Sequence, residues 1–183
     1  MFSLKGFVSG WDNFFYKKTD ATALCVFRIA FGFFLFLNGI SLVQDFHEWY
    51  GIGDASLVPL HDSLTYYSDF RINVFKWLEP TEFSAWMVLL TYILTSVCVM
   101  IGFNTRITTI VCFILMVSLQ NRNYVILNSG DTLMRCMLFL MMFAPTHVKY
   151  SLDAYFKEKE GEPYSPEVSF LTIRLMQLQF SLV

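Results

Sequence analysis

The stretch NRNYVILNSGDTLMR, residues 121–135, decides the fold of this chain because it lies between two strongly apolar runs. It is polar and rich in turn-forming residues, whereas both of its neighbours have the composition of membrane-embedded helices. Asp131 and Arg135 are placed four residues apart, in the first turns of the second apolar run. Because charges in a membrane helix cost free energy, such residues mark either an internal structural pair or a working site.

The composition of the whole chain points to a lipid bilayer as its solvent. Of the 183 residues, 55% are hydrophobic and only 15% are charged, and the mean hydropathy is +0.49. Soluble domains carry about 25% charged residues. A formal net charge of −2 without a basic stripe argues against nucleic acid as a partner. We therefore expect an integral membrane protein in contact with membrane lipid, in the plasma membrane or, in a bacterium, the inner membrane.

Apolar runs predict an all-α integral membrane fold, a polytopic helical bundle with four spans and part of a fifth. The four predicted spans are residues 21–43, 83–103, 107–119 (continuing through the milder 121–127) and 132–144. Gly32 and Gly39 in the first span are expected to allow close contact between helices. A fifth helix is predicted to begin at Pro166 and to continue through residues 170–183, which are too few to cross a bilayer.

The predicted domain boundary lies between residues 18 and 19. Residues 1–18 are mixed and aromatic, without the long apolar run of a cleavable signal peptide, and form a predicted cytoplasmic segment. Residues 19–183 form the predicted transmembrane domain. The last apolar run has no capping or charged stop signal, so we expect the domain to be truncated at its C-terminus, as a piece of a longer protein.

The distribution of basic residues predicts that the N-terminus is cytoplasmic. With this orientation, the inside segments carry most of the basic residues between the spans: Lys5, Lys17, Lys18, Arg106, Lys149, Lys157 and Lys159. The outside segments carry Arg71, Lys76 and Arg122. The predicted outside loop, residues 44–82, is acidic and aromatic, which suits the headgroup region. Within it, residues 69–78 fit either a short interfacial helix or an ordinary loop packed on the bundle.

Two interpretations of Asp131 and Arg135 stay open at this point. Their spacing of four places both side chains on one helix face, and a carboxylate is favoured near a helix N-terminus. They form either an intrahelical ion pair that also ties a neighbouring helix, or a polar cavity in which both side chains touch a substrate.

Two further arginines fall inside apolar runs. Arg28 and Arg174 lie at similar depths if both helices start from the cytoplasmic side. Each can extend to lipid phosphates, or the two can share a basic site for an anionic ligand inside the bundle. Neither has an acidic partner at that depth, which favours lipid contact or a partner beyond this sequence.

Cysteine and histidine positions predict no metal site. The cysteines lie in apolar runs without a C-x-x-C spacing, which is typical of small core residues: Cys25, Cys98, Cys112 and Cys136. The histidines are scattered, without a pair at helical spacing: His47, His61 and His147.

Two motifs resemble a known family of membrane domains. Asp20, followed by Leu24, Phe27, Arg28 and Gly32, fits a polar Asp before a Leu-x-x-Phe-Arg-x-x-x-Gly run. This pattern resembles the opening of the HTTM (horizontally transferred transmembrane) domain, the membrane module of vitamin K-dependent gamma-carboxylases and of many bacterial proteins. Its second hallmark is similar to residues 122–135, and the start of its next helix to residues 174–179. The resemblance covers nearly all of the chain, from about Thr19 to Val183.

The resemblance implies a polytopic helical domain and two alternative roles. One family activity is carboxylation of protein glutamates driven by reduced vitamin K, so this or another quinone is the implied cofactor, although the residues alone make none evident. The lysine proposed as base in the carboxylases follows the helix on which this chain stops, so no catalytic residue is carried over. The alternative role is a non-catalytic membrane partner for maturation, export or immunity of a secreted peptide.

Overall fold

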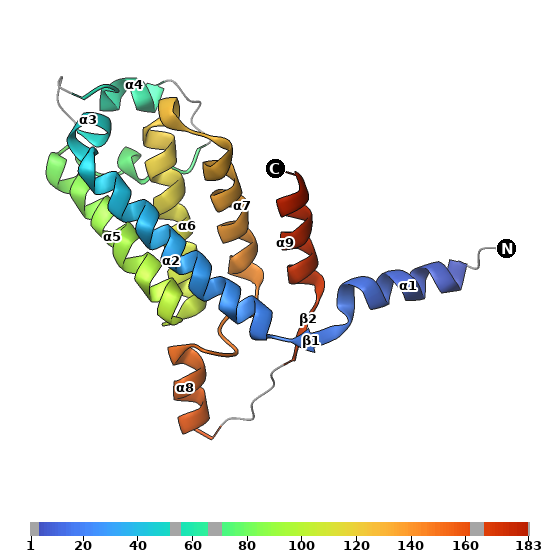
Figure 1. The fold of residues 1–183 in the computed structure, drawn as a ribbon. Helices are drawn as coiled ribbons and strands as arrows, with labels where there is room; N and C mark the ends of the chain where they lie inside the picture. Colours follow the sequence, from blue (N-terminus) through green and yellow to red (C-terminus); the bar gives the residue numbers. More distant parts are fainter. Residues whose placement is uncertain (1–3, 52–55, 66–70, 162–166, 183) are drawn as a thin grey trace.

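The computed structural model describes residues 4–51, 56–65, 71–161 and 167–182. The described part is almost entirely helical, with one short two-stranded sheet (Figure 1). The α-helices are α1 (Leu4–Tyr16), α2 (Thr22–Gln44), α3 (Phe46–Tyr50), α4 (Leu60–Thr65), α5 (Glu82–Ile101), α6 (Thr105–Arg122), α7 (Ser129–Phe143), α8 (Leu152–Lys159) and α9 (Leu171–Leu182). The strands are β1 (Lys18–Asp20) and β2 (Glu167–Ser169), and two 3-10 turns are η1 (Val74–Lys76) and η2 (Tyr124–Ile126). The predicted all-α class is therefore confirmed.

Four helices form the bundle, and their contacts follow the order of the chain. Helix α2 packs on α5, α5 on α6 and α6 on α7, while α9 lies against α7 (Figure 1). One end of this bundle carries α3, α4 and η2, and is called the α3–α4 end below. The other end carries α8 and the turn between α5 and α6, and is called the α8 end.

Close packing of α2 on α5 depends on glycine, as predicted. A Cβ atom added to Gly32 would lie 2.7 Å from both the Cα and the N atom of Met100. One added to Gly39 would lie 2.7 Å from Cγ1 of Ile93. Small residues therefore let the two helices approach each other to backbone contact.

Helices α2 and α5 are the two described helices that are long and apolar enough to cross a membrane. They expose large apolar side chains outward, including Phe33, Phe34, Leu37, Phe83, Leu90 and Leu94. Helix α7 has 15 residues, a length of about 22 Å, and a bilayer core is about 30 Å thick. The predicted spans at α6 and α7 thus stay predictions.

The polar stretch at residues 121–135 is only partly irregular. Helix α6 continues through Asn121 and Arg122, then η2 follows, and α7 begins at Ser129. Asn121 and Arg122 are buried, and each side chain donates a hydrogen bond to a backbone carbonyl, Asn121 to Ile72 and Arg122 to Val58. The predicted turn at residues 102–106 is present, with Gly102 and Asn104 left-handed, but Thr105 and Arg106 already belong to α6.

The predicted fifth helix begins later than expected. Pro166 lies outside the described residues, and residues 167–169 form strand β2 instead of helix. This strand pairs antiparallel with β1, with Lys18 opposite Ser169 and Asp20 opposite Glu167. The amino group of Lys18 also lies 3.5 Å from the Glu167 carboxylate. Residues 167–169 pair with β1 and do not continue the helix expected from Pro166, so α9 begins only at Leu171.

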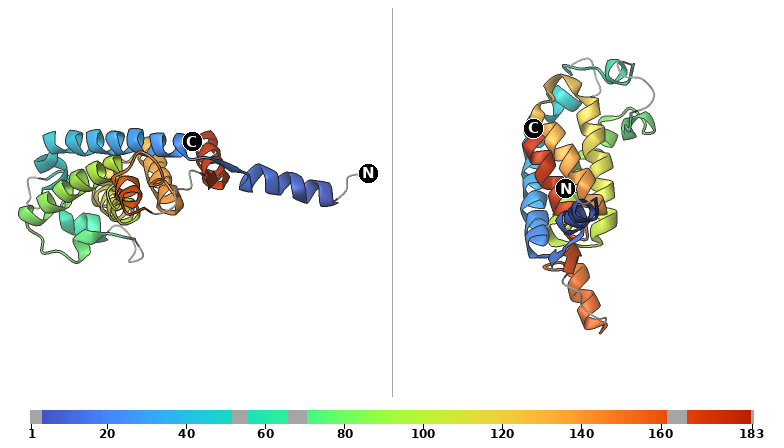
Figure 2. Two further views of the ribbon diagram at one scale, coloured as in Figure 1. Left: turned by 90° about the horizontal axis from the view of Figure 1, so that it is seen from below. Right: turned by 90° about the vertical axis from the view of Figure 1, so that its right-hand side faces the viewer.

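The interfacial helix considered for residues 69–78 is wrong where the structure describes it. Residues 69 and 70 lie outside the described residues, and residues 71–78 contain only the turn η1. The Val74 N–H donates to the Ser118 hydroxyl at 3.0 Å, and Phe75 is buried. This segment is therefore a loop packed on α6. Helix α1 was not predicted, and it projects sideways from the bundle (Figures 1 and 2).

Candidate functional site

A small polar cavity lies inside the bundle at the α3–α4 end. Its volume is about 40 Å³, which gives room for about one to three water molecules. Its polar lining comes from five elements and their junctions: Asn38, Tyr50, Tyr92, Gln120, Asn123 and Asp131. Most of the remaining lining is aliphatic. The cavity is thus a polar pocket enclosed by apolar helices.

Two buried tyrosines supply hydroxyl groups to this cavity. The Tyr92 hydroxyl donates to Oδ1 of Asn38 at 3.0 Å, which joins α5 to α2. Tyr50 is also buried, and burial raises the pKa of its hydroxyl; the charge of Asp131 raises it further, while Arg122 opposes both. Tyr50 therefore keeps its proton at neutral pH and remains a hydrogen-bond donor.

Asp131, predicted as a site residue, fixes the start of α7. Its carboxylate accepts from the Asn128 N–H at 2.9 Å, and the Asn128 side chain accepts from the Asp131 N–H at 3.1 Å. This reciprocal arrangement is a capping box. The local sequence explains it, because Asn before Ser-Gly-Asp supplies both side chains at the required spacing of three residues. Asp131 thus caps a helix and lines the cavity with one side chain.

Arg135 meets Asp131 through a third residue. Its Nε and Nη2 atoms donate to Oε1 of Gln120 at 2.9 and 2.8 Å. The Gln120 amide in turn donates to the Asp131 backbone carbonyl at 3.3 Å. Within the described part of the chain, the two charged groups form no direct ion pair. Gln120, which the sequence reasoning passed over, therefore joins α6 to both residues of α7.

Arg122, counted in the sequence as an outside loop residue, is buried at the end of α6. Its side chain is 0% exposed. Nη1 donates to the Val58 carbonyl and Nη2 to the Gly51 carbonyl, both at 2.7 Å. A cation is favoured in the last turn of a helix, where the dipole is negative. Arg122 thus holds the loop that follows α3 against the bundle, and its place after an apolar run was the available signal.

Arg28 plays a similar part at the α8 end. It is also 0% exposed, so it does not extend to lipid phosphates. Nη2 donates to the Tyr150 carbonyl at 2.6 Å and Nη1 to the Val99 carbonyl at 3.3 Å. The Val99 carbonyl belongs to the last turn of α5, where carbonyls lack helical partners. A Cβ atom on Gly102 would overlap the guanidinium, so only glycine fits there.

Arg174 has different partners, and no contact joins it to Arg28 in the described residues. Its guanidinium lies over the rings of Phe14 and Phe170, at 4.2 and 4.4 Å from their centroids. Nη1 donates to Gln177 at 3.0 Å. The shared basic site suggested for the two arginines is therefore not formed by direct contact. Cation–π contacts with Arg174 instead connect α9 to α1.

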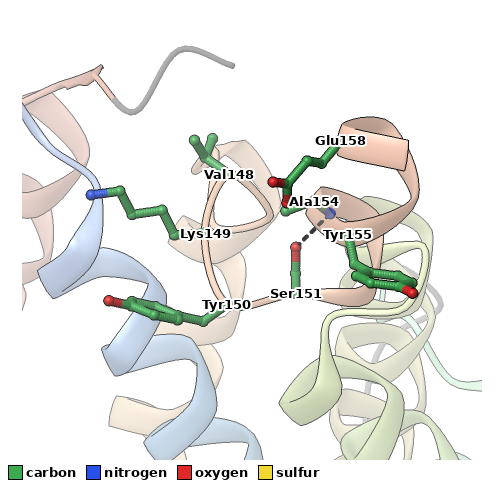
Figure 3. A pocket seen from close by; sticks show the side chains of 7 residues that line it. All are labelled: Val148, Lys149, Tyr150, Ser151, Ala154, Tyr155 and Glu158. Atoms are coloured by element: carbon green, nitrogen blue, oxygen red, sulfur yellow. Dashed lines mark hydrogen bonds between the residues drawn. The ribbon is translucent and has the colours of Figure 1, made fainter. Parts of the chain in front are cut away.

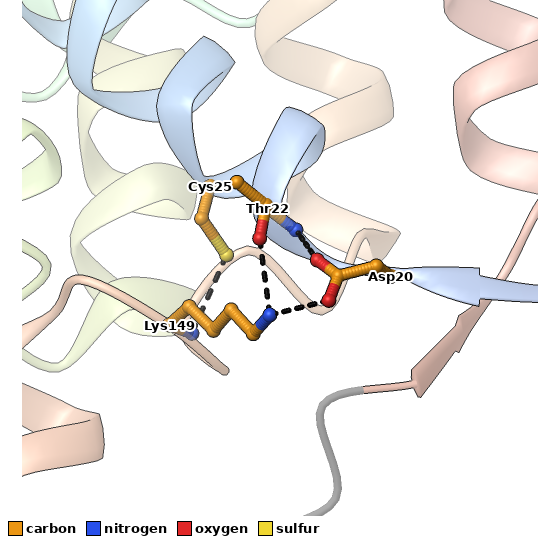
Figure 4. A network of polar contacts seen from close by, with 4 residues as sticks. All are labelled: Asp20, Thr22, Cys25 and Lys149. Atoms are coloured by element: carbon orange, nitrogen blue, oxygen red, sulfur yellow. Dashed lines mark hydrogen bonds and ion pairs between the residues drawn. The ribbon is translucent and has the colours of Figure 1, made fainter.

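A second polar network, not predicted, closes the α8 end (Figure 4). The Lys149 amino group lies 2.5 Å from the Asp20 carboxylate and 3.0 Å from the Thr22 hydroxyl. The hydrogen bond from Lys149 lowers the pKa of Asp20 to about 2, and bonds from Thr22 contribute. The Lys149 N–H also contacts the sulfur of Cys25 at 3.4 Å. These contacts fasten the loop after α7 to the start of α2.

A surface pocket of about 440 Å³ lies between this loop and α8 (Figure 3). Tyr155 and Glu158 line it from the helix, and Ser151 caps the helix by accepting from the Ala154 N–H at 2.9 Å. The Lys149 side chain extends away toward α2, where it meets Asp20. With its lysine engaged and a glutamate in its lining, the pocket is poorly suited to an anion.

Comparison with known protein families identifies the domain. The HTTM domain matches residues 16–183, which is nearly the whole chain. The chain belongs to the HTTM domain family. Both resembling motifs, at residues 20–32 and 122–135, fall inside the matched range. HTTM is a membrane domain, and the apolar outer faces of α2 and α5 agree with this location.

Searches of curated proteins and of solved structures find no match to this HTTM chain. Its motif residues can nevertheless be given physical roles from their contacts. The Phe-Arg-x-x-x-Gly run of α2 provides the buried Arg28 and the close contact at Gly32. The second motif provides Arg122 and the capping box of α7. Both motifs thus hold helices and loops together at opposite ends of the bundle.

Proposed function

We propose that this chain works as an HTTM membrane domain of the carboxylase type, which crosses the membrane four times with its N-terminus in the cytoplasm. Helices α6 and α7 lie beside the two apolar helices in one bundle, which supports counting them as spans. Basic residues gather at the α8 end, as expected for a cytoplasmic face: Lys17, Lys18, Arg106, Lys149, Lys157 and Lys159. Residues 1–18 form the cytoplasmic segment in this proposal.

Cysteine labelling tests the orientation and the span count together. Glu79→Cys and Val125→Cys place exposed thiols at the α3–α4 end, and Glu160→Cys places one at the α8 end. The background carries Cys98→Ala and Cys136→Ala, since Cys25 and Cys112 are buried. A membrane-impermeant reagent added to intact cells is expected to label Glu79→Cys and Val125→Cys only. Labelling of Glu160→Cys alone would reverse the orientation. Labelling of only one of Glu79→Cys and Val125→Cys would show that α5 and α6 do not both cross the membrane.

The polar cavity carries the functional part of the proposal. Asp131, Tyr50 and Tyr92 converge there, inside an otherwise apolar bundle and close to one membrane face. Polar groups at such a depth are expensive and usually serve a site. We place recognition of a peptide or protein substrate at this end, with the partly exposed Asp131 as the contacting group.

The quinone cofactor of the carboxylases does not fit the cavity beside Asp131. Pockets for small molecules have volumes of about 300–1,000 Å³, whereas this cavity has about 40 Å³. Its arginine neighbours also have protein partners already, since Arg122 binds two backbone carbonyls and Arg135 binds Gln120. No quinone-dependent step is therefore assigned to these residues.

This misfit favours a second candidate function, a non-catalytic membrane partner for maturation, export or immunity of a secreted peptide. Such a role needs a stable, peptide-accessible surface and no redox cofactor. The loops held by Arg122 at the α3–α4 end would provide that surface.

Purified protein in lipid nanodiscs distinguishes the two roles. Incorporation of labelled CO₂ into glutamate peptides, dependent on reduced vitamin K, is expected for a carboxylase and absent for a partner. Asp131→Asn tests the site, because the amide keeps the size of the side chain but removes its charge. Turnover that is lost in this variant supports the first role. Peptide binding without turnover supports the second.

A further inference from the structure

The α8 end has a second cavity, smaller than the surface pocket beside α8, and a buried hydroxyl group lines it. Thr146 is 1% exposed, and its Oγ1 atom has no hydrogen-bond partner among the described residues. A buried, unsatisfied hydroxyl group costs about 1–3 kcal/mol, so such an atom usually points to a missing ligand or water. It lines a cavity of about 100 Å³ between the start of α6 and the segment after α7.

The charges around this cavity select an anion. Arg106 and His147 line it together with Thr146. Arg106 stands in the first turn of α6, where the positive end of the helix dipole favours an anion. The nearby carboxylate, Asp153, caps this same N-terminus: its two oxygens accept from the N–H groups of Asn104 and Thr105 and from the Thr105 hydroxyl, so both are already engaged there.

His147 is the third polar group of this cavity. Burial lowers the pKa of its imidazole, and Lys157 lowers it further. Arg106 and Arg28 act in the same direction, and Asp153 opposes them. The imidazole is therefore neutral at physiological pH and still offers one N–H to an acceptor. Thr146, His147 and Arg106 together provide a hydroxyl, an imidazole and a guanidinium around a space that fits a phosphate group.

An apolar track leads away from this cavity along α6 and α7. Phe143 lines the cavity and is 66% exposed. Its ring centroid lies 5.2 Å from that of Phe139, which lies 5.9 Å from that of Phe113. Ile107 and Ile110 are exposed on the same stretch of α6. A polar cavity at a helix end that continues into an exposed aromatic row has the shape of a phospholipid, with the headgroup first and the acyl chain after it.

We propose that Thr146, His147 and Arg106 form a binding site for a phosphate group, carried by a phospholipid whose acyl chain lies on Phe143, Phe139 and Phe113. This site is separate from the cavity beside Asp131, which lies at the other end of the bundle. Only the leaflet it faces rests on the proposed orientation, so the site remains whichever way the labelling experiment places the α8 end.

Binding is tested by native mass spectrometry of the protein with phosphatidylglycerol. Arg106→Gln is expected to weaken lipid retention by about tenfold or more, because a charge-assisted hydrogen bond is lost. Thr146→Val keeps the shape and should weaken retention by about threefold to tenfold, without lowering the melting temperature, because its hydroxyl has no protein partner. Lys159→Gln, an exposed cation on α8 outside the cavity, is the matched control.

Two further arms identify the source of the phosphate. Phe143→Ala should weaken retention of phosphatidylglycerol but leave thermal stabilisation by inorganic phosphate unchanged, if the ligand is a lipid. Phosphate stabilisation that depends on Arg106, with equal lipid retention in Phe143→Ala and the native protein, would replace the lipid with a free anion. Equal losses in Arg106→Gln and Lys159→Gln, or none in Thr146→Val, would overturn the site.

Discussion

Arg28 and Arg122 lie at opposite ends of the bundle. Each buries a guanidinium group that is bonded to backbone carbonyls, but the lengths of these bonds differ. Both are fully buried, both donate to two backbone carbonyls, and neither has a carboxylate partner among the residues that the structure describes. Arg122 makes two bonds of 2.7 Å at the end of a helix, whereas Arg28, near the start of α2, makes one of 2.6 Å and one of 3.3 Å. A buried cation in this fold is thus neutralised by carbonyl dipoles of helix ends and loops.

The largest expected effect comes from removing either arginine. Arg122→Met should lower the free energy of unfolding by about 3–6 kcal/mol, because two charge-assisted bonds are lost. Arg28→Met should cost less, about 2–4 kcal/mol, since one of its two bonds is long. Unfolding in mixed micelles with increasing dodecyl sulfate measures both.

The lysine variants are the control for this pair. Lys keeps the charge but cannot reach two carbonyls as a planar fork. We expect Arg122→Lys to recover less than half of the loss in Arg122→Met. A larger loss for Arg28→Met than for Arg122→Met would reverse the ranking of the two ends.

The next effect concerns how α2 packs on α5 toward each end. Gly32→Ala should destabilise by about 1–3 kcal/mol, because its new Cβ meets backbone atoms that cannot move alone. Gly39→Ala should cost less, because the atom it meets is Cγ1 of Ile93, a side-chain atom that can shift. Melting temperatures in one detergent compare the two, and equal shifts would contradict the ranking.

A smaller effect tests whether Asp131 and Arg135 interact directly or through Gln120. A double-mutant cycle with Gln120→Ala and Arg135→Ala should give a coupling energy of about 0.5–1.5 kcal/mol. The cycle with Asp131→Ala and Arg135→Ala should give less than about 0.5 kcal/mol, because no ion pair joins those two side chains within the described residues. A strong second coupling would restore the direct pair.

The smallest effect is the pH dependence of the Asp20–Lys149 contact. In the folded protein the pKa of Asp20 is about 2, below its ordinary value of 3.8. The contact therefore stabilises the fold fully above pH 3.8 and loses this contribution as the pH falls toward 2. Asp20→Asn should make the melting temperature slightly less dependent on pH over this range. The change is small because the carboxylate is exposed. An identical slope in the variant would show that other carboxylates control it.

The sequence was sufficient for the features that depend on periodicity and local chemistry. The long helices α2 and α5, the small residues between them and the turn after α5 all follow from local patterns. The partners of Arg28, Arg122 and Arg135 could not be predicted, because each bonds to a carbonyl or amide that only tertiary folding brings near. Gln120 shows this most clearly, since a glutamine near the end of an apolar helix gives no sign of the residues it will join.

The pairing of β1 with β2 sets an order on how this chain can assemble. Lys18 and Ser169 are opposite each other although almost the whole chain separates them, and the Phe170 N–H donates to the Lys17 carbonyl at 3.1 Å. During synthesis, β1 can therefore pair with β2 only after α7, α8 and residues 167–169 have left the ribosome. The sheet therefore forms late in synthesis, after helices α2 to α8 have been made.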